Sequence, residues 1–244
     1  MMNAAAGIFL AARRKPKWTN PYVTEGLVAM WDGEWNVGGG VHESDLANLN
    51  GKWKDLSGNG NDLVLNTAFC EITSNGMKRV YNTSANGPVG TLQMRTTYPV
   101  TIEACVTPSD RGLSRACPVV TYGPVNGTAT SCLINKTPTS FEWSSRFNNR
   151  TAVFVKGVPV TVSSVAPGGS SDARGYRKAT EISATSSDSW GFESDVVAVL
   201  GDSRNNDYVA FGYVAHNVRL YSRALTSAEI AENYAVDKAR FNLP

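Results

Sequence analysis

Short runs of apolar or alternating residues, separated by turn-forming residues, recur along most of the chain. A period of two is typical of strands with one buried face. The turn signals are dense: the chain has 22 Gly, 11 Pro and Asn-Gly pairs at 50–51, 59–60, 75–76, 86–87 and 126–127. The pattern predicts strands near 27–31, 63–65, 78–81, 91–94, 100–107, 118–122, 131–135, 140–143, 152–156, 158–163, 181–184, 196–200, 208–213 and 217–221. So many short strands without helical periodicity between them predict a sandwich or barrel rather than a parallel sheet with crossover helices.

Two stretches of the chain give more local predictions. In 101–107, Ile102, Ala104 and Val106 share one face of the expected strand, whereas Cys105 points with Glu103 to the other. The stretch 163–176 is rich in Ser, Gly and Ala and contains Pro-Gly-Gly at 167–169, so it is predicted to be a long surface loop.

The only convincing helical signal lies at the C-terminus. Thr226 and Glu229 have the spacing of a capping box, and Leu225 can pack against Ile230 as a hydrophobic staple. The predicted helix runs to about Asp237 or Ala239. Ile230 and Tyr234, four residues apart, are expected to face the sheets.

The composition is that of a folded chain with a near-neutral body. Of 244 residues, 42% are hydrophobic, 9% aromatic and 18% charged, which excludes a wholly disordered protein. Four of the 23 basic residues (Arg13, Arg14, Lys15 and Lys17) precede the first acidic residue, which leaves 19 basic against 21 acidic residues in the remainder. A body without basic excess argues against a nucleic-acid surface. We therefore divide the chain into an N-terminal docking or linker segment, 1–22, and one domain, 23–244.

The N-terminal segment from Ala4 to Lys17 has an apolar run followed by positive charges. A secretory signal has the reverse order, and about nine apolar residues are too few to cross a bilayer. The segment is thus predicted to be a peptide that docks into a partner, with a frayed terminus as the alternative. No membrane insertion is expected.

The four cysteines, Cys70, Cys105, Cys117 and Cys132, have no CxxC or Cys/His pairing typical of zinc sites. Without an export signal, free thiols are favoured over disulfides.

Three segments, in order, carry a resemblance to a known family: WKDLSGNGND at 53–62, TIEA at 101–104 and VRLYSRALT at 218–226. They resemble the laminin-G-like, concanavalin A-like lectin and glucanase group, and with the two ends of the domain the match spans 26–241. The resemblance implies an all-β fold, a two-sheet antiparallel jelly-roll β-sandwich with a short C-terminal helix, whose rim loops carry the ligand site. Members often have an aromatic residue where Cys105 stands and an Asp-Glu pair where this chain has His216-Asn217, so no ligand role of that pair carries over.

One group of polar residues has both a structural and a functional interpretation. The segment DLSGNGND can form a turn through its own Asx side chains, yet Asp55, Asn59 and Asp62 also offer the hard oxygen atoms that calcium prefers. No cofactor is required by any motif, and a calcium ion at this turn is the alternative to a purely structural turn. Arg219 and Arg223 are expected to pin the loop before the helix to the helix itself.

Motifs for catalysis are incomplete. The glucanase branch looks like a strand with Glu-x-Asp-x-x-Glu, and the closest match, Glu193-Ser194-Asp195, has Ala198 in place of the last carboxylate. Gly201-Asp202-Ser203 resembles an esterase nucleophile block, but the downstream Asp-x-x-His is absent: Tyr213 stands three residues before His216. The glycine clusters lack the spacing of a phosphate-binding loop. We expect no enzyme activity, with a glucanase-type glycoside hydrolase as the least favoured function.

A binding or structural module remains. Sugar sites use an aromatic face with planar polar partners, and the rim candidates are Trp35, Trp190, Arg204, Asn205, Asn206, Asp207 and Tyr208. The structural alternative is that both tryptophans are packing residues. The opening GLVAMWDG at 26–33 and the ending DKARF at 237–241 are similar to those of compact phage and prophage proteins of gut bacteria. These resemblances imply a lectin-like adhesion module on a phage particle, bound to a tail or capsid protein through its N-terminal segment. A purely structural virion or surface protein, a bacterial cell-surface location and a homo-oligomer stay open.

Overall fold

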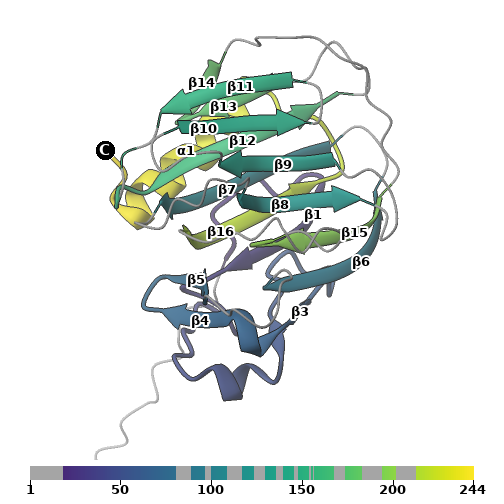
Figure 1. Ribbon diagram of the computed structural model, residues 1–244, viewed down its shortest axis with the longest axis vertical. Helices are drawn as coiled ribbons and strands as arrows, with labels where there is room; N and C mark the ends of the chain where they lie inside the picture. Colours follow the sequence, from purple (N-terminus) through teal and green to yellow (C-terminus); the bar gives the residue numbers. More distant parts are fainter. Residues whose placement is uncertain are drawn as a thin grey trace, which may run out of the picture.

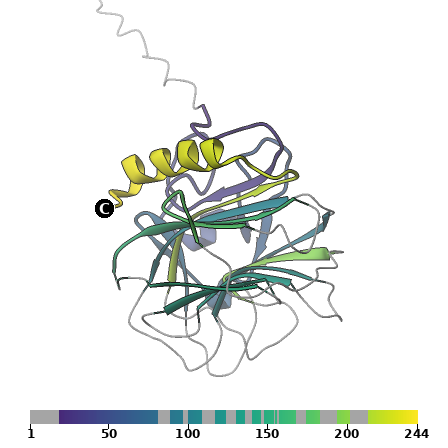
Figure 2. The ribbon, with the colours of Figure 1, turned by 90° about the horizontal axis from the view of Figure 1, so that it is seen from above.

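The computed structural model describes residues 19–80, 89–96, 100–108, 117–123, 130–135, 140–145, 148–153, 155, 157–167, 174–182, 194–201 and 213–244. These residues form two eight-stranded antiparallel sheets stacked face to face, with one long helix outside one of them (Figures 1 and 2). The architecture confirms the predicted β-sandwich with a C-terminal helix.

The sheet beneath the helix is called the helix-side sheet. Its strands follow the order β14-β13-β12-β7-β16-β5-β4, and β1 also pairs with β16. The strands are β1 (Leu27–Asp32), β4 (Cys70–Thr73), β5 (Gly76–Arg79), β7 (Val100–Pro108), β12 (Val160–Ala166), β13 (Arg174–Arg177), β14 (Thr180–Ile182) and β16 (Tyr213–Tyr221). The two longest, β7 and β16, are neighbours in the middle of this sheet.

The opposite sheet has the order β11-β10-β9-β8-β15-β6-β3-β2. Its strands are β2 (Lys52–Trp53), β3 (Leu63–Leu65), β6 (Gly90–Thr96), β8 (Cys117–Gly123), β9 (Thr130–Asn135), β10 (Ser140–Ser145), β11 (Asn148–Val153) and β15 (Ser194–Val199). Two short 3-10 helices, η1 (Leu46–Leu49) and η2 (Thr67–Phe69), lie in the connections before β2 and β4, and α1 spans Ser227–Phe241.

The space between the sheets holds an apolar core. Its largest side chains, Trp31 and Trp53, are fully buried, and each indole N–H donates to a backbone carbonyl, of Asn61 (2.8 Å) and Asp32 (2.9 Å) respectively. Burying an indole without such a partner would cost the hydrogen bond it makes with water. Burial of apolar area thus holds the two sheets together.

The two central strands turn opposite chemistry to their two faces. In β7, Ile102, Ala104 and Val106 belong to the core between the sheets, and Glu103 lies outside that core, as the alternation predicts. In β16 the pairing register with β7 shifts between Ala215 and Asn217. Such a bulge moves the apolar set from Ala215 to Val218 and lets consecutive polar residues leave the core face.

The prediction of a surface loop over 163–176 is wrong at both ends of this stretch. β12 continues to Ala166 by pairing with β7, and β13 begins at Arg174 and pairs with β12. Serine in this stretch suggests a surface position, but Ser163 is buried and donates its hydroxyl to Glu103 (2.9 Å). A polar side chain is compatible with a buried strand when its hydrogen bond is satisfied.

Other element boundaries differ by a few residues. The alternation predicts no strand at β2, β4 or β13, and it places β11 too late in the chain. The predicted strand 208–213 lies outside the described residues except for Tyr213, where β16 begins.

The Asn-Gly signal at 75–76 marks the β4–β5 hairpin, but the paired residues Thr73 and Gly76 leave Ser74 and Asn75 as the turn. Gly76 lies in β5 itself, where there is no space for a side chain: a Cβ there would lie 2.2 Å from Val214 Cγ1 and 2.9 Å from the Ala215 carbonyl oxygen.

The capping box predicted for α1 is confirmed. Thr226 accepts from the Glu229 amide (3.3 Å), and the Glu229 carboxylate accepts from the Thr226 amide (2.8 Å). Leu225 and Ile230 are both buried in one cluster, in agreement with the staple. The helix is longer than predicted and ends at Phe241, capped by Asn242 in a left-handed conformation. Among the described residues no helix is long and apolar enough to span a membrane.

Candidate functional site

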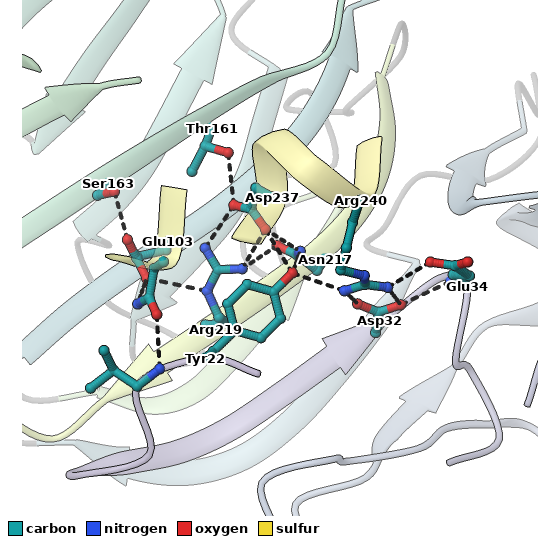
Figure 3. A network of polar contacts seen from close by, with 12 residues as sticks. Tyr22, Asp32, Glu34, Glu103, Thr161, Ser163, Asn217, Arg219, Asp237 and Arg240 are labelled. Atoms are coloured by element: carbon teal, nitrogen blue, oxygen red, sulfur yellow. Dashed lines mark hydrogen bonds and ion pairs between the residues drawn. The ribbon is translucent and has the colours of Figure 1, made fainter. Parts of the chain in front are cut away.

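The layer between α1 and the helix-side sheet is polar and buried. It contains a continuous set of hydrogen bonds and ion pairs that we call the sub-helical network (Figure 3). Its members are Tyr22, Asp32, Glu103, Thr161, Ser163, Asn217, Arg219, Tyr221, Asn233, Asp237 and Arg240. They come from the first described residues, four strands and the helix.

Arg219 is at the centre of the network and is fully buried. Its Nη1 and Nη2 atoms donate to the two carboxylate oxygens of Asp237, both at 2.9 Å, and its Nε donates to Glu103 Oε2 at 3.2 Å. The guanidinium also lies 4.1 Å from the centroid of the Tyr22 ring. One cation thus joins the helix to β7, in the two-pronged geometry that guanidinium and carboxylate groups favour.

The two carboxyl groups bound to Arg219 have opposite pKa shifts. Burial raises the pKa of Glu103, and the Arg219 charge offsets this only partly. Burial acts in the same direction on Asp237, but the Arg219 charge and hydrogen bonds, with those from Asn217 and Thr161, hold the pKa of Asp237 below its ordinary value. Asp237 is therefore the firm anion of the pair, and Glu103 is the carboxyl group that takes up a proton more readily.

Tyr22 brings the start of the domain into the network. Its hydroxyl donates to Asp237 Oδ1 (2.7 Å) and accepts from Asn217 Nδ2 (2.9 Å) and Arg240 Nη1 (2.8 Å). Burial raises the pKa of Tyr22. Although Tyr22 is the last residue of the predicted N-terminal segment, it is only 3% exposed and packs into the body.

A second guanidinium, that of Arg240, lies at the edge of the network. It donates to both oxygens of Asp32 (2.7 and 3.0 Å) and to Glu34 (2.8 Å), and it stacks 3.4 Å from the centroid of the Trp35 ring. Burial raises the pKa of Asp32 despite this pairing. Trp35, a candidate sugar ligand, is thus also a packing partner for the cation.

The prediction for Arg219 and Arg223 is confirmed in its main point. Arg223 donates to both carboxylate oxygens of Glu229 in the first turn of α1, and Arg219 pairs with Asp237 nearer its end. The two arginines hold the helix at two places, one solvent-accessible and the other fully buried.

The calcium candidates lie in one turn, where the protein itself occupies much of their bonding capacity. The Asp55 carboxylate accepts from the backbone amides of Met30 and Asn61, each at 2.9 Å. Asn59 donates its amide to the Leu27 carbonyl (2.9 Å), and Asp62 pairs with Lys54. In the part of the chain that the structure describes, no group of three or more His, Cys, Asp and Glu side chains could hold a metal ion. The observed bonds are those of the structural alternative, a turn fixed by its Asx side chains.

The other predicted site residues lie outside the described residues. These are Trp190, Arg204, Asn205, Asn206, Asp207, Tyr208 and the segment from Ala4 to Lys17. Of the cysteines, Cys70 and Cys105 are buried free thiols, as expected, and burial raises the pKa of Cys70 to about 12.

The sub-helical network was not expected as a unit, although its signal is in the sequence. Polar residues alternate with apolar ones in both 101–107 and 217–221, and Asn233, Asp237 and Arg240 recur at helical spacing. Two strands and a helix with matching polar faces indicate a buried polar layer. Chemically, the layer is a set of satisfied pairs beneath a helix, and it resembles a structural clamp more than an open reaction site.

Neither a protein-family model nor a curated protein matches this sequence. Several solved structures resemble the fold. Trypanosoma rangeli sialidase in complex with sialic acid matches 86% of this chain at 15% identity with a TM-score of 0.62. The receptor binding domain of botulinum neurotoxin type G matches 87% at 12% identity (TM-score 0.60), and the binding domain of Paraclostridial Mosquitocidal Protein 1 matches 90% at 13% identity (TM-score 0.55).

The likeness covers 32% of the sialidase chain, 52% of the neurotoxin domain and 53% of the mosquitocidal protein domain. This chain therefore spans about a third to a half of the length of these proteins. At such low identity the likeness establishes the fold alone, a two-sheet antiparallel β-sandwich.

Proposed function

We propose that this chain is a non-catalytic, lectin-like adhesion module that binds glycans on a host or mucosal surface. The observation that carries the proposal is the two-sheet sandwich that it shares, over 87% and 90% of its length, with two solved structures named as binding domains. A sandwich of this kind presents loops on a rigid support, which is the usual arrangement of recognition sites.

The state of the described carboxylates supports a binding role over hydrolysis. Retaining glycosidases need two carboxyl groups about 5–5.5 Å apart that flank the substrate. Here Glu103, on β7, and Asp237, on the buried face of α1, are fully buried and share Arg219. Both carboxyl groups are inaccessible to solvent and paired with Arg219, so in this arrangement they serve the packing of the helix.

The proposed location is a phage particle, on the tail or capsid, with the segment from Ala4 to Lys17 as the attachment. This part of the proposal rests on the resemblance of the two ends of the domain to phage proteins and on the basic character of the segment. A bacterial cell surface is the alternative location.

A glycan array tests the binding role, with the chain applied in calcium and in EDTA. Specific binding to a group of glycans is expected; binding at background level to every glycan would make the domain purely structural. Trp190→Ala and Tyr208→Ala should weaken binding about five-fold or more, since aromatic stacking on a sugar contributes about 1–3 kcal/mol by analogy with other ring stacking. Ala231→Ser, on the exposed face of α1, is the matched control. Turnover of β-glucans or sialosides would contradict the non-catalytic assignment.

Trp35→Ala separates the two roles of that ring. Lost glycan binding with an unchanged unfolding transition would assign Trp35 to the glycan. Lost stability with unchanged binding would assign it to Arg240, which it contacts in the structure.

Attachment is tested by deleting residues 1–18, which keeps Tyr22 and its contacts. The shortened chain should fold and should fail to enter particles, as measured by mass spectrometry of purified particles. A full-length control in which Arg13, Arg14, Lys15 and Lys17 become Ser distinguishes loss of the basic charges from loss of the peptide. Normal incorporation of the deletion variant would exclude the docking role.

A further inference from the structure

The first described residues form a strap along α1. Residues 20–26, called the N-terminal strap, run antiparallel to the helix: Tyr22 bonds to Asp237, and the Val23 amide donates to Asn233 Oδ1 at 2.9 Å. At the other end, Arg223 Nε donates to the Glu25 carbonyl (3.0 Å) and the Ser222 amide to the Gly26 carbonyl (2.8 Å). The strap thus contacts the helix near its end and its middle, and the turn just before it.

The strap fits its site closely. Gly26 has a φ of +73°, and a Cβ there would lie 2.9 Å from Arg223 Cγ. From Gly26 the chain passes directly into β1, which pairs with β16 from Leu27 to Asp32. The strap is therefore continuous with the sheet on one side and bonded to the helix on the other.

Tyr22 supplies the densest contact of the strap. One hydroxyl group joins three side chains from two elements: Asn217 of β16, and Asp237 and Arg240 of α1. Its ring covers Arg219, the cation that holds α1 to β7. Loss of this hydroxyl would remove one hydrogen bond from each of these three side chains, although they keep their other bonds, so strap and helix are energetically linked.

We infer that the N-terminal strap and α1 form one cooperative unit with Tyr22 as its latch, so that opening the strap loosens the helix and the reverse. The role of this latch rests on the proposed function: a domain held through the residues before the strap would pass an applied load through Tyr22 to α1. The coupling itself is a property of the free chain. Local opening units of this kind are a general feature of folded proteins.

Hydrogen exchange of the full-length chain, followed by mass spectrometry, tests the latch. Tyr22→Phe keeps the ring over Arg219 and removes only the hydroxyl. We expect about ten-fold faster exchange in peptides covering both the strap and the second half of α1, with little change in β7 and β16. Tyr176→Phe is the matched control, because Tyr176 is equally buried and its hydroxyl lies 3.2 Å from that of Ser227 at the start of α1, whereas the Tyr22 hydroxyl bonds to Asp237 and Arg240 near its end. It should affect only the first turn.

Three outcomes would overturn the inference. The strap could exchange faster while α1 stays protected, in which case the two open independently. All strands could respond equally, in which case Tyr22 supports the whole fold and is no local latch. Tyr176→Phe could loosen the strap as much as Tyr22→Phe, in which case any contact to α1 would suffice.

A second measurement needs no variant. Native-state exchange of the unmodified chain in low denaturant should give strap and α1 amides a common opening free energy, below that of β7 and β16. Different opening free energies for strap and helix would contradict the latch. Because both experiments use the chain without a partner, they can fail or succeed independently of glycan binding and of attachment to a particle.

Discussion

The two layers of the molecule are held together by different forces. Between the sheets, apolar side chains such as Ile102, Val218 and Leu220 are buried against one another. On the other face of the same two strands, Glu103, Asn217 and Arg219 are equally buried but lie beneath α1 in a charged network (Figure 3). One pair of strands therefore lines both layers. In the apolar core, the loss of unfolding free energy on substitution scales with the buried area that is removed. In the polar layer, each charged group depends on a specific partner.

The polar layer contains an imbalance of charge. Three buried carboxyl groups, those of Asp32, Glu103 and Asp237, face the two guanidinium groups of Arg219 and Arg240. Burial raises the pKa of Asp32 and Glu103, while Arg219 keeps Asp237 ionised. The difference from the apolar core is that removal of a cation here leaves uncompensated charge, whereas removal of a methyl group there leaves only a cavity.

The largest expected effect is the loss of the central cation. Arg219→Met should lower the free energy of unfolding by about 3–5 kcal/mol, because Glu103 and Asp237 stay buried without their counter-charge. Urea unfolding followed by tryptophan fluorescence measures the change.

Arg223→Met, four residues further along, is the matched control. Its ion pair with Glu229 is partly exposed, with 24% of the Arg223 side chain accessible, so the expected cost is about 1 kcal/mol or less. Equal costs for the two variants would show that burial does not set the strength of these pairs.

The next comparison uses neighbouring residues of β7 that face different layers. Ile102→Ala should cost about 3 kcal/mol through a cavity between the sheets. Glu103→Gln should cost less than about 1 kcal/mol, because its carbonyl oxygen can still accept from Arg219 and Asn233 and its amide can donate to Ser163. Both are read from chemical unfolding at pH 7.

The companion variant Asp237→Asn sharpens this comparison. Both Asp237 oxygens accept hydrogen bonds, from Arg219, Tyr22, Asn217 and Thr161, so an amide nitrogen must face a donor. We expect Asp237→Asn to destabilise the fold by more than Glu103→Gln. The reverse order would mean that Glu103, despite its raised pKa, is the essential anion.

The contrast between the layers also explains how far the sequence could predict this structure. The period-two pattern in 101–107 and the Thr226-Glu229 capping box depend on neighbours in the chain, and both are confirmed. The network joins Tyr22 to Asp237, 215 residues away, and no local pattern encodes that distance. The bulge in β16 adds a second obstacle, since it turns His216 and Asn217 away from the core and breaks the alternation from which faces are predicted. Polar residues satisfied by distant partners, such as Ser163, therefore look like loop residues in the sequence.

Acidification tests a node at the edge of the polar layer. The ring of His216 is held by the Asn75 carbonyl at Nδ1 (2.8 Å) and by Thr107 Oγ1 at Nε2 (2.6 Å), and it stacks on Phe241 at 4.9 Å. A carbonyl only accepts, so Nδ1 carries the proton of the neutral ring. Burial lowers the pKa of His216, although Asp32 and Asp237 nearby act to raise it; Arg240 acts to lower it.

Because the folded pKa is below the unfolded value of about 6.5, the stabilising contribution of neutral His216 is complete above pH 6.5 and is lost as the pH falls below it. The loss is at most about 1.4 kcal/mol per pH unit. Unfolding free energies at pH 7.5, 6.5 and 5.5 should fall more steeply for the unmodified chain than for His216→Gln. The raised pKa values of Asp32 and Glu103 act in the opposite direction in both proteins, so the difference between them isolates the histidine. Parallel pH curves would rule out this role.

The smallest expected effect concerns the edge of the helix-side sheet, where the backbone conformation of a turn, rather than burial or charge, sets the change in stability. Arg177 pairs with Thr180 across the β13–β14 hairpin, and the two turn residues, Lys178 and Ala179, have φ values of +52° and +61°. Two positive values define a type I′ turn, in which glycine is favoured at the second position.

Ala179→Gly should raise the thermal midpoint. Relief of the left-handed conformation should stabilise the fold by about 0.5–1 kcal/mol, reduced by the lost contact of the Ala179 methyl group with its apolar cluster. Ala166→Gly, in the core-facing strand β12 and without a positive φ, should instead cost about 1 kcal/mol. If both substitutions destabilise the chain equally, packing of the methyl group outweighs backbone strain even at this edge of the sheet.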